Sequence, residues 1–214
     1  MKQHAKITWK EACSNVSAIL LAGGKARRMG GINKALLNID GETIIQREIK
    51  TLERLFDNII IITNSFEQYA FLGKQMFQDI RSGYGSLGGL FTGLSKCSTE
   101  YGFVFACDMP FLNEKIVAYI CERSIGHDVT VPRIGGWLEP LHAVYSRRCV
   151  TFMENLMRLG DLKIINFFHE VDVVEINQEE LEQIDPELRF RINVNTPDDL
   201  ALVIDTSKAE SIFS

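Results

Sequence analysis

The chain has 214 residues, of which 46% are hydrophobic and 24% are charged. This composition is ordinary for a soluble globular protein and excludes a collagen-like or disordered chain, and the length favours a single domain. The formal net charge of −5 at pH 7 gives no general support to a nucleic-acid partner or to an anionic-membrane partner.

Cysteine usage and the N-terminus predict a cytoplasmic location. The five cysteines form no C-x-x-C pair, and an odd number does not suit a disulfide framework. We therefore expect reduced thiols at Cys13, Cys97, Cys107, Cys121 and Cys149. No apolar stretch follows the N-terminal lysines, so no secretory signal is predicted, and the longest apolar runs are too short to cross a bilayer.

The first predicted elements are an extension, a strand, a helix and a second strand. Residues 1–15 are polar and mixed, which predicts a loosely ordered extension. Residues 16–22 form a short apolar run that stops at Gly23-Gly24, which predicts a strand buried on both faces. Apolar residues recur at helical spacing over 42–56, and β-branched residues predict the next strand over 58–63.

A glycine-rich loop divides the next pair of predicted elements from the third buried strand. We expect a helix over 65–77 and a brief strand over 78–80. The glycine-rich loop over 82–89 then leads into a helix that ends near Cys97, and residues 101–107 read as a buried strand.

The second half of the chain continues the alternation of helices and strands. Asn113 is predicted to cap a helix that ends near Arg123. Two strands over 127–132 and 137–145 flank Gly135-Gly136, which predicts an antiparallel hairpin. The remaining predicted elements are helices near 147–159 and 162–168, a strand over 171–176 and a helix that starts at Thr196 and Pro197.

This alternation predicts βαβ units with right-handed crossovers, and therefore a mainly parallel sheet. No linker divides residues 16–205 into two parts. We predict one α/β domain over residues 16–205, with an N-terminal extension over 1–15 and a C-terminal tail over 206–214.

The first candidate site motif is LAGGKARRMGGINK over residues 21–34, directly after the first predicted strand. Glycines let the backbone approach a ligand, and their N–H groups can bind an anion. Lys25, Arg27, Arg28 and Lys34 add positive charge, and a polyphosphate needs both properties. The alternative is a tight turn with solvated cations. The motif lacks both the P-loop spacing and the G-x-G-x-x-G fingerprint, so a nicotinamide-dependent oxidoreductase is unsupported.

Two further motifs carry candidate polar ligands. Asp108 follows the strand predicted over 101–107, and a carboxylate at this edge could hold Mg²⁺, which takes one or two carboxylates together with waters and phosphates. The alternative is a turn or cap residue. Asn193 and Asn195 belong to NVNTPDDL, where the polar residues could contact a ligand, start a helix, or do both.

The three motifs resemble those of the molybdenum cofactor guanylyltransferases, the MobA-like group of nucleotidyltransferases, and the resemblance spans residues 17–203. It implies a single-domain, Rossmann-like three-layer α/β fold with a mostly parallel mixed sheet. It also implies transfer of GMP from GTP to a molybdopterin-type cofactor, with release of pyrophosphate. Implied further partners are a molybdoenzyme or a cofactor-insertion protein. Ser86 stands where the family usually has proline, and Leu162 stands where it usually has a basic residue.

The resemblance also implies roles for single residues. Lys34, Arg28 and Asp108 are implied as catalytic, with Asp108 as the ligand of Mg²⁺. The implied nucleotide contacts are Leu21, Ala22, Gly23, Gly24, Lys34, Asn64, Asp79 and Asp108, and the implied acceptor contacts are Asn193, Asn195 and Lys163. From the residues alone, Asn64 could instead be a turn residue and Asp79 a surface carboxylate.

Alternative functions use the same motifs differently. One is cytidylyl transfer to the same pterin, or nucleotidyl transfer to a sugar phosphate. Another is a non-catalytic nucleotide-binding protein, although loss of Asp108 or Lys34 would be expected there and both residues are present. No nucleophile–histidine arrangement is evident. His142 alternates with apolar neighbours and reads as a structural histidine with satisfied ring nitrogens, and Cys107 reads as a small buried residue.

Overall fold

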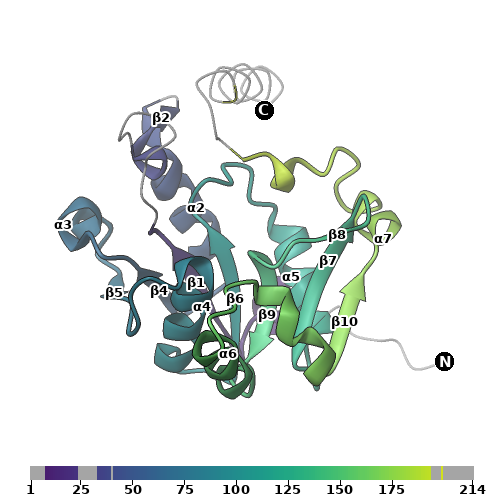
Figure 1. Cartoon of the computed structure of the whole chain (residues 1–214). Coiled ribbons are helices and arrows are strands. Elements are labelled where there is room, and N and C mark those ends of the chain that lie inside the picture. Colours follow the sequence, from purple (N-terminus) through teal and green to yellow (C-terminus); the bar gives the residue numbers. More distant parts are fainter. Residues whose placement is uncertain (1–7, 24–32, 40, 194–198, 200–214) are drawn as a thin grey trace.

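A mixed, mostly parallel sheet forms the centre of the molecule in the computed structural model, which describes residues 8–23, 33–39, 41–193 and 199 (Figure 1). The order of the main strands is β10-β7-β9-β6-β1-β4-β5, and β8 pairs with β7. The strands are β1 (Val16–Leu21), β4 (Ile59–Ile62), β5 (Gln75–Phe77), β6 (Tyr101–Ala106), β7 (Val129–Ile134), β8 (Trp137–Leu138), β9 (His142–Ser146) and β10 (Val173–Ile176). A separate two-stranded ribbon consists of β2 (Asn38–Ile39) and β3 (Glu42–Thr43).

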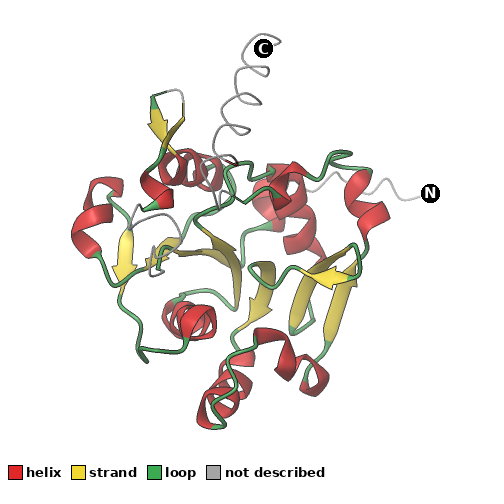
Figure 2. Cartoon of the chain, turned by 45° about the horizontal axis from the view of Figure 1, so that its top comes forward, coloured by secondary structure: helices red, strands yellow, loops and turns green. Residues whose placement is uncertain are grey.

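Two layers of helices cover the sheet, one on each face (Figure 2). On one face, α2 (Ile44–Glu53), α5 (Glu114–Arg123) and α7 (Gln178–Glu182) share an apolar core with the sheet. On the other face, α4 (Gly85–Lys96) and α6 (Cys149–Arg158) form a second core. The shorter helical segments are α1 (Trp9–Ala12), α3 (Phe66–Tyr69), η2 (Lys34–Leu36), η3 (Ala70–Leu72), η4 (Ile164–Glu170) and η5 (Arg189–Arg191).

Strand direction places most carboxyl ends at one edge of the sheet. β1 pairs in parallel with both β4 and β6, and β4 pairs in parallel with β5. The chain moves from β1 to β4 and β5 on one side, and then crosses to β6 on the other. This change of direction makes the carboxyl ends of β1 and β6 the topological switch point, which is where open α/β sheets bind ligands. The predicted α/β fold with a mostly parallel mixed sheet is confirmed.

The predicted antiparallel hairpin forms, but its second strand is broken. β7 pairs antiparallel with β9, with Val129 opposite Tyr145. The strand predicted over 137–145 is instead divided into β8 and β9, with a turn over 139–141 between them. Because β9 is antiparallel to both β6 and β7, β7 is parallel to β6. The carboxyl end of β7 therefore lies at the same edge as that of β6.

Helix α2 begins two residues after the predicted start at position 42 because Thr43 caps it. The Thr43 Oγ1 accepts from the Gln46 backbone N–H at 3.4 Å, and the Gln46 Oε1 accepts from the Thr43 backbone N–H at 3.0 Å. This reciprocal pair satisfies N–H groups at the helix start that have no partner within the helix. The buried face of α2 carries Ile45 and Ile49 at helical spacing, as the sequence predicts.

Helix α4 begins at Gly85, inside the loop predicted over 82–89. Missing Cβ atoms allow this helix to lie very close to the sheet. A Cβ on Gly93 would lie 2.3 Å from Ile19 Cγ2, and a Cβ on Gly102 of β6 would lie 2.4 Å from Ile19 Cδ1. No side chain fits at such distances in a packed interior, so glycine at both positions lets α4 and β6 close over Ile19.

The segment over 65–80 differs from the sequence prediction. Instead of one helix it forms the short turns α3 and η3, which end at Gly73 with a φ of 62°. The strand expected over 78–80 is β5 over 75–77, because these residues pair in parallel with Ile60–Ile62 of β4. Pairing with a distant strand therefore outweighs the local pattern here.

Other predicted elements agree with the structure. β1, β4, β6 and β10 lie within the predicted strands, and the predicted helix near 147–159 is α6. The Asn113 Oδ1 caps α5 by accepting from the Lys115 N–H at 3.0 Å and from the Ile116 N–H at 3.4 Å. The helix predicted near 162–168 is a 3-10 segment, η4. The predicted helix start at Thr196 and Pro197 lies outside the described residues.

Part of the predicted extension is ordered. Helix α1 is capped by Thr8, whose Oγ1 accepts from the Glu11 N–H at 3.3 Å, and α1 packs against α5. Cys13 after it is buried, so the loose order predicted for 1–15 does not hold for this segment, while 1–7 and the tail over 206–214 lie outside the described residues. All five cysteines are free thiols, as predicted. Among the described residues, no helix has the length and apolar character needed to cross a membrane.

Candidate active site

The carboxyl ends of β1, β4 and β6 are joined by backbone hydrogen bonds at the switch point. The Ala22 N–H donates to the Ile62 carbonyl at 2.9 Å, and the Cys107 N–H donates to the Leu21 carbonyl at 3.4 Å. Leu21 and Ala22 are buried, whereas Gly23 is exposed just beyond the strand. A Cβ on Gly23 would meet only the Ile62 carbonyl oxygen, at 4.0 Å. Among the described residues there is therefore free space beside Gly23. A ligand could approach the Gly23 backbone through this space.

Asp108 lies in the turn after β6 and is partly buried. Burial raises the pKa of its carboxyl, while the Lys34 ammonium nearby lowers it, and burial has the larger effect. Desolvation disfavours the charged form, so a further positive charge at this place would favour the carboxylate. Lys34 and Asp108, which the sequence identified in two separate motifs, therefore lie within electrostatic range of each other.

Lys34 is held by the residue before it. The Asn33 Oδ1 accepts from the Ala35 N–H at 3.2 Å, which caps η2, and its Nδ2 donates to the Tyr69 hydroxyl at 2.8 Å. Tyr69 is buried, and burial raises its pKa to about 12. Asn33 therefore ties the start of η2 to α3 and fixes the backbone from which the Lys34 side chain extends.

Asn64 and Asp79 form a reciprocal pair beyond the ends of β4 and β5. The Asn64 Nδ2 donates to Asp79 Oδ2 at 3.0 Å, and the Asp79 backbone N–H donates to Asn64 Oδ1 at 3.3 Å. The two contacts close a ring that orients both side chains. A Cβ on Gly89 of α4 would lie 3.9 Å from Asp79 Oδ1 and 3.2 Å from Leu21 Cδ2, so the start of α4 borders this pair closely.

The predicted acceptor contacts lie toward the other end of the sheet. Lys163 is exposed at the start of η4, which leads into β10. Asn193 is exposed after η5, and the Arg191–Glu139 ion pair at 3.0 Å ties this segment to the turn between β8 and β9. The remaining predicted site residues, Gly24, Lys25, Arg27, Arg28 and Asn195, lie outside the described residues.

Sequence reasoning missed Glu48, which it had counted only as part of the helical pattern over 42–56. Glu48 lies on the buried face of α2 and is 1% exposed. Its carboxyl lies in the electrostatic environment of Asp108, Cys107 and Tyr69. The available signal was a charged residue inside an apolar stripe at helical spacing, which is rare unless the charge is partnered or functional.

Two groups that could carry protons or act as nucleophiles are unsuited to those tasks. His142 is fully buried between Phe103 and Phe190, and burial lowers its pKa to about 3. Its burial agrees with the predicted structural role, but the prediction that its ring nitrogens are satisfied is wrong, because neither has a hydrogen-bond partner among the described residues. Burial raises the pKa of the Cys107 thiol, with Glu48 and Asp108 adding to the effect, so the thiolate is strongly disfavoured.

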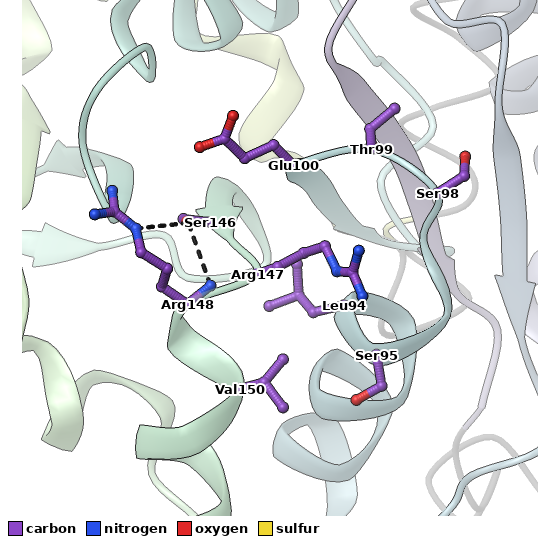
Figure 3. A pocket seen from close by; sticks show the side chains of 9 residues that line it. All are labelled: Leu94, Ser95, Ser98, Thr99, Glu100, Ser146, Arg147, Arg148 and Val150. Atoms are coloured by element: carbon purple, nitrogen blue, oxygen red, sulfur yellow. Dashed lines mark hydrogen bonds between the residues drawn. The ribbon is translucent and has the colours of Figure 1, made fainter.

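A cavity of about 700 Å³ lies away from this site (Figure 3). It is formed by the end of α4, the residues before β6 and the residues after β9, and therefore lies at the edge opposite Asp108. Arg148 on its wall donates from its backbone N and its Nε to Ser146 Oγ, each at 3.3 Å, and pairs with Asp128 at 3.0 Å. These contacts hold the connection from β9 to α6.

The donor set at the switch point is compatible with Mg²⁺. Among the described residues, no three or more His, Cys, Asp or Glu side chains are grouped so that they could hold a metal ion. Mg²⁺ does not need such a group, because it commonly uses one or two carboxylates together with waters and substrate phosphates. The partly buried Asp108 carboxylate, whose pKa burial raises, is a suitable single ligand.

Comparisons with known proteins find relatives over most of the chain. The model of the MobA-like NTP transferase domain matches residues 18–174. The probable molybdenum cofactor guanylyltransferase of Methanosarcina mazei is 37% identical over 207 residues, which covers 90% of this chain and 91% of the relative. The molybdenum cofactor guanylyltransferase of Desulfosudis oleivorans is 37% identical over 186 residues, which covers 86% of this chain and 92% of that protein.

Solved structures show the same architecture. The crystal structure of molybdopterin-guanine dinucleotide biosynthesis protein A from Archaeoglobus fulgidus has a TM-score of 0.78 and 25% identity, with 90% of this chain and 99% of that chain covered. A 4-diphosphocytidyl-2C-methyl-D-erythritol synthase from Anaerococcus prevotii has a TM-score of 0.68 with 12% identity, and covers 94% of this chain and 98% of its own. At that identity the second likeness shows the fold alone. The family match over most of the chain, together with these full-length relatives, places the chain in the MobA-like NTP transferase family.

Proposed function

We propose that this chain transfers the guanylyl group of GTP to a molybdopterin-type cofactor, which yields the guanine dinucleotide cofactor and pyrophosphate. The observation that carries the proposal is the position of the Asp108 carboxyl after β6 at the switch point of the sheet, with the Lys34 ammonium within electrostatic range. The relatives with the printed name molybdenum cofactor guanylyltransferase support the choice of donor and acceptor. We assign the activity to the cytoplasm, with a molybdoenzyme or a cofactor-insertion protein receiving the product.

The Asn64–Asp79 pair suits a guanine base. A carboxylate accepts hydrogen bonds at both oxygens, and guanine presents two adjacent N–H donors on its pairing edge, whereas cytosine presents one amino group there. The Asn64 amide already occupies one position on Asp79 Oδ2, which fixes the orientation of the carboxylate before a base binds. Gly23 at the end of β1 would let the nucleotide lie against the strand.

The reaction is an in-line displacement at the α-phosphorus of GTP. An oxygen of the acceptor's terminal phosphate forms the new bond to the α-phosphorus, and the bond from the α-phosphorus to the bridging oxygen of pyrophosphate breaks. A phosphate monoester has a second pKa of about 6, so the attacking group is largely dianionic at neutral pH and needs no general base. This chemistry agrees with the unsuitability of His142 and Cys107 as proton carriers.

The side chains then act by positioning the phosphates and by neutralising charge. The Lys34 ammonium would bind the phosphates and stabilise pyrophosphate as it leaves, with Arg28 of the same motif assisting. Asp108 would hold Mg²⁺, which, when bound, supplies positive charge beside the α-phosphate. Asn193, Asn195 and Lys163 would contact the acceptor.

A nucleotide panel tests the proposal. The purified protein is incubated with molybdopterin, Mg²⁺ and each nucleoside triphosphate in turn, pyrophosphate release is followed, and the product is identified by mass. We expect GTP to be the only nucleoside triphosphate that yields a dinucleotide. No turnover is expected when Mg²⁺ is removed by a chelator. A cytidine dinucleotide would instead favour the cytidylyl alternative. GTP binding without pyrophosphate release would favour a non-catalytic nucleotide-binding protein.

A further inference from the structure

The segment that carries Asp79 lies along helix α4. Asp79, Ile80 and Arg81 connect β5 to α4 and belong to neither a helix nor a strand. A Cβ on Gly89 would lie 3.9 Å from Asp79 Oδ1, and a Cβ on Gly88 would lie 3.1 Å from the Arg81 carbonyl oxygen. Because these two positions of α4 carry no side chain, the segment can lie directly against the helix.

One buried hydroxyl of α4 binds the backbone of this segment. Thr92 lies three residues after Gly89, so the two positions share one face of α4. Thr92 is fully buried, and its Oγ1 accepts from the Ile80 backbone N–H at 3.0 Å. The Ile80 side chain is 49% exposed, so apolar burial does little to hold the segment at this point. The hydrogen bond to Thr92 therefore fixes the peptide that joins Asp79 to Ile80.

Other contacts hold the same segment from the solvent side. The Asp79 carboxylate accepts from Asn64 Nδ2 at 3.0 Å, and Arg81 pairs with Glu154 of α6. Asn64 is exposed, and both side chains of the ion pair are more than a third exposed, so water competes for these contacts. Water competes less for the hydroxyl of the buried Thr92. Thr92 is therefore the contact that best defines the backbone position of Asp79.

We propose that Thr92 is a positioning residue that determines base specificity: by holding the Ile80 N–H, it fixes the backbone that presents the Asp79 carboxylate to the guanine base. A carboxylate that is fixed in advance loses less freedom when a base binds, and it discriminates more sharply against a base that lacks a donor. The inference rests on the proposed contact between Asp79 and guanine.

Two substitutions separate this role from packing. Thr92→Val keeps the shape of the side chain and removes the acceptor, whereas Thr92→Ser keeps the hydroxyl. Binding is measured by equilibrium dialysis with GTP and with inosine triphosphate (ITP), whose base lacks the 2-amino group of guanine. We expect Thr92→Val to raise the Kd for GTP about three- to tenfold, the usual effect of one lost hydrogen bond, and to raise the Kd for ITP by less. The preference for GTP over ITP should therefore narrow.

Three further measurements define the effect. Thr92→Ser should keep the preference for GTP within about twofold of the wild type, because its hydroxyl can still accept from the Ile80 N–H. The kcat of Thr92→Val at saturating GTP should equal that of the wild type, since the loss concerns binding of the base. The matched control is Thr51→Val in α2, which removes a buried hydroxyl that donates to the Arg47 carbonyl at 3.1 Å, and it should leave both Kd values unchanged.

Asp79→Asn is measured in parallel to separate the inference from the base contact on which it rests. Wild-type preference for GTP in Asp79→Asn would overturn that base contact. Loss of preference in Asp79→Asn, together with wild-type Kd values in folded Thr92→Val, would overturn the role of Thr92 alone, and Thr92→Ala replaces Thr92→Val if the latter fails to fold. Equal loss in Thr92→Val and Thr92→Ser would also overturn it, because serine keeps the hydroxyl. The nucleotide panel tests the transfer reaction independently of these results.

Discussion

The two halves of the carboxyl edge are built differently. Beyond β1, β4, β5 and β6, the candidate nucleotide contacts are joined to one another, with Asn64 bound to Asp79 and Lys34 lying near Asp108. Toward β7 and β10, the described candidate acceptor contacts Lys163 and Asn193 are exposed and lie on connecting segments. Within the described residues, the side chains of the candidate nucleotide half are therefore oriented before any ligand binds, and such preorganisation favours electrostatic catalysis. Both described contacts of the candidate acceptor half are exposed, and solvent screens the charge of Lys163.

The largest expected effect is that of Asp108→Ala. We expect Mg²⁺-dependent transfer to fall by at least about 10³-fold, since the variant removes the proposed, partly buried metal ligand of the nucleotide half. Pyrophosphate release at saturating GTP measures the loss. The matched control is Asp57→Ala, which removes an exposed carboxylate that pairs with Lys10 at 2.8 Å. If Asp108→Ala fails to fold, the result would favour the alternative in which Asp108 is a turn residue and not a metal ligand.

Lys34→Ala should have the next largest effect. Loss of one preorganised electrostatic group typically costs about 10²- to 10³-fold in turnover, and Lys34 lies on a turn that Asn33 fixes. The measurement is single-turnover formation of the dinucleotide. The control is Lys10→Ala in α1, which removes the other partner of the Asp57 ion pair. Near-normal turnover in Lys34→Ala would remove the lysine from the mechanism.

Lys163→Ala should have a smaller effect that is confined to the acceptor. Because the Lys163 side chain is exposed, its attraction to a phosphate is screened, and we expect the KM for molybdopterin to rise about three- to tenfold with little change in the KM for GTP. Initial rates at varied concentrations of each substrate measure both constants. A rise in the KM for GTP of the same size would contradict the division of the edge into two halves.

His142 is expected to affect stability without affecting catalysis. Its folded-state pKa of about 3 lies below the ordinary value of 6.5, so its contribution to stability is fully present above pH 6.5 and is lost as the pH falls toward 3. The loss approaches about 1.4 kcal/mol of unfolding free energy per pH unit in this window. Urea unfolding of the wild type and of His142→Leu at several pH values tests this. A pH slope that is equal in both proteins would contradict it.

The sequence predicted the buried strands well because each is a short apolar run that ends at a glycine or at polar residues. β1, β4 and β6 lie inside the predicted ranges for this reason. β5 was misplaced because its position depends on pairing with β4, which no local pattern records. The start of α4 was also missed, since glycines that usually indicate a loop are needed here for close contact with Ile19.

The sequence predicted the parts of the candidate site as separate motifs. Which of these motifs lie near one another could be seen only from the fold. Lys34 and Asp108 were each identified in a motif that follows a strand. Parallel pairing of β1 with β6 brings the two strand ends together, and η2 places Lys34 within electrostatic range of Asp108. Asn64 and Asp79 similarly meet because β4 and β5 are parallel neighbours. Glu48 was missed because a helix face is judged by its majority of apolar residues, and the fold alone places this carboxyl within electrostatic range of Asp108.

The close contact of Gly93 with Ile19 has a practical consequence for engineering a more heat-resistant form. Replacement of a helical glycine by alanine usually stabilises a protein, because alanine has the higher helix propensity. In α4 this substitution would place a methyl group 2.3 Å from Ile19 Cγ2, so the helix would have to move outward. Since α4 also borders Asp79 through Gly89, that movement would displace a wall of the candidate nucleotide site along with the core.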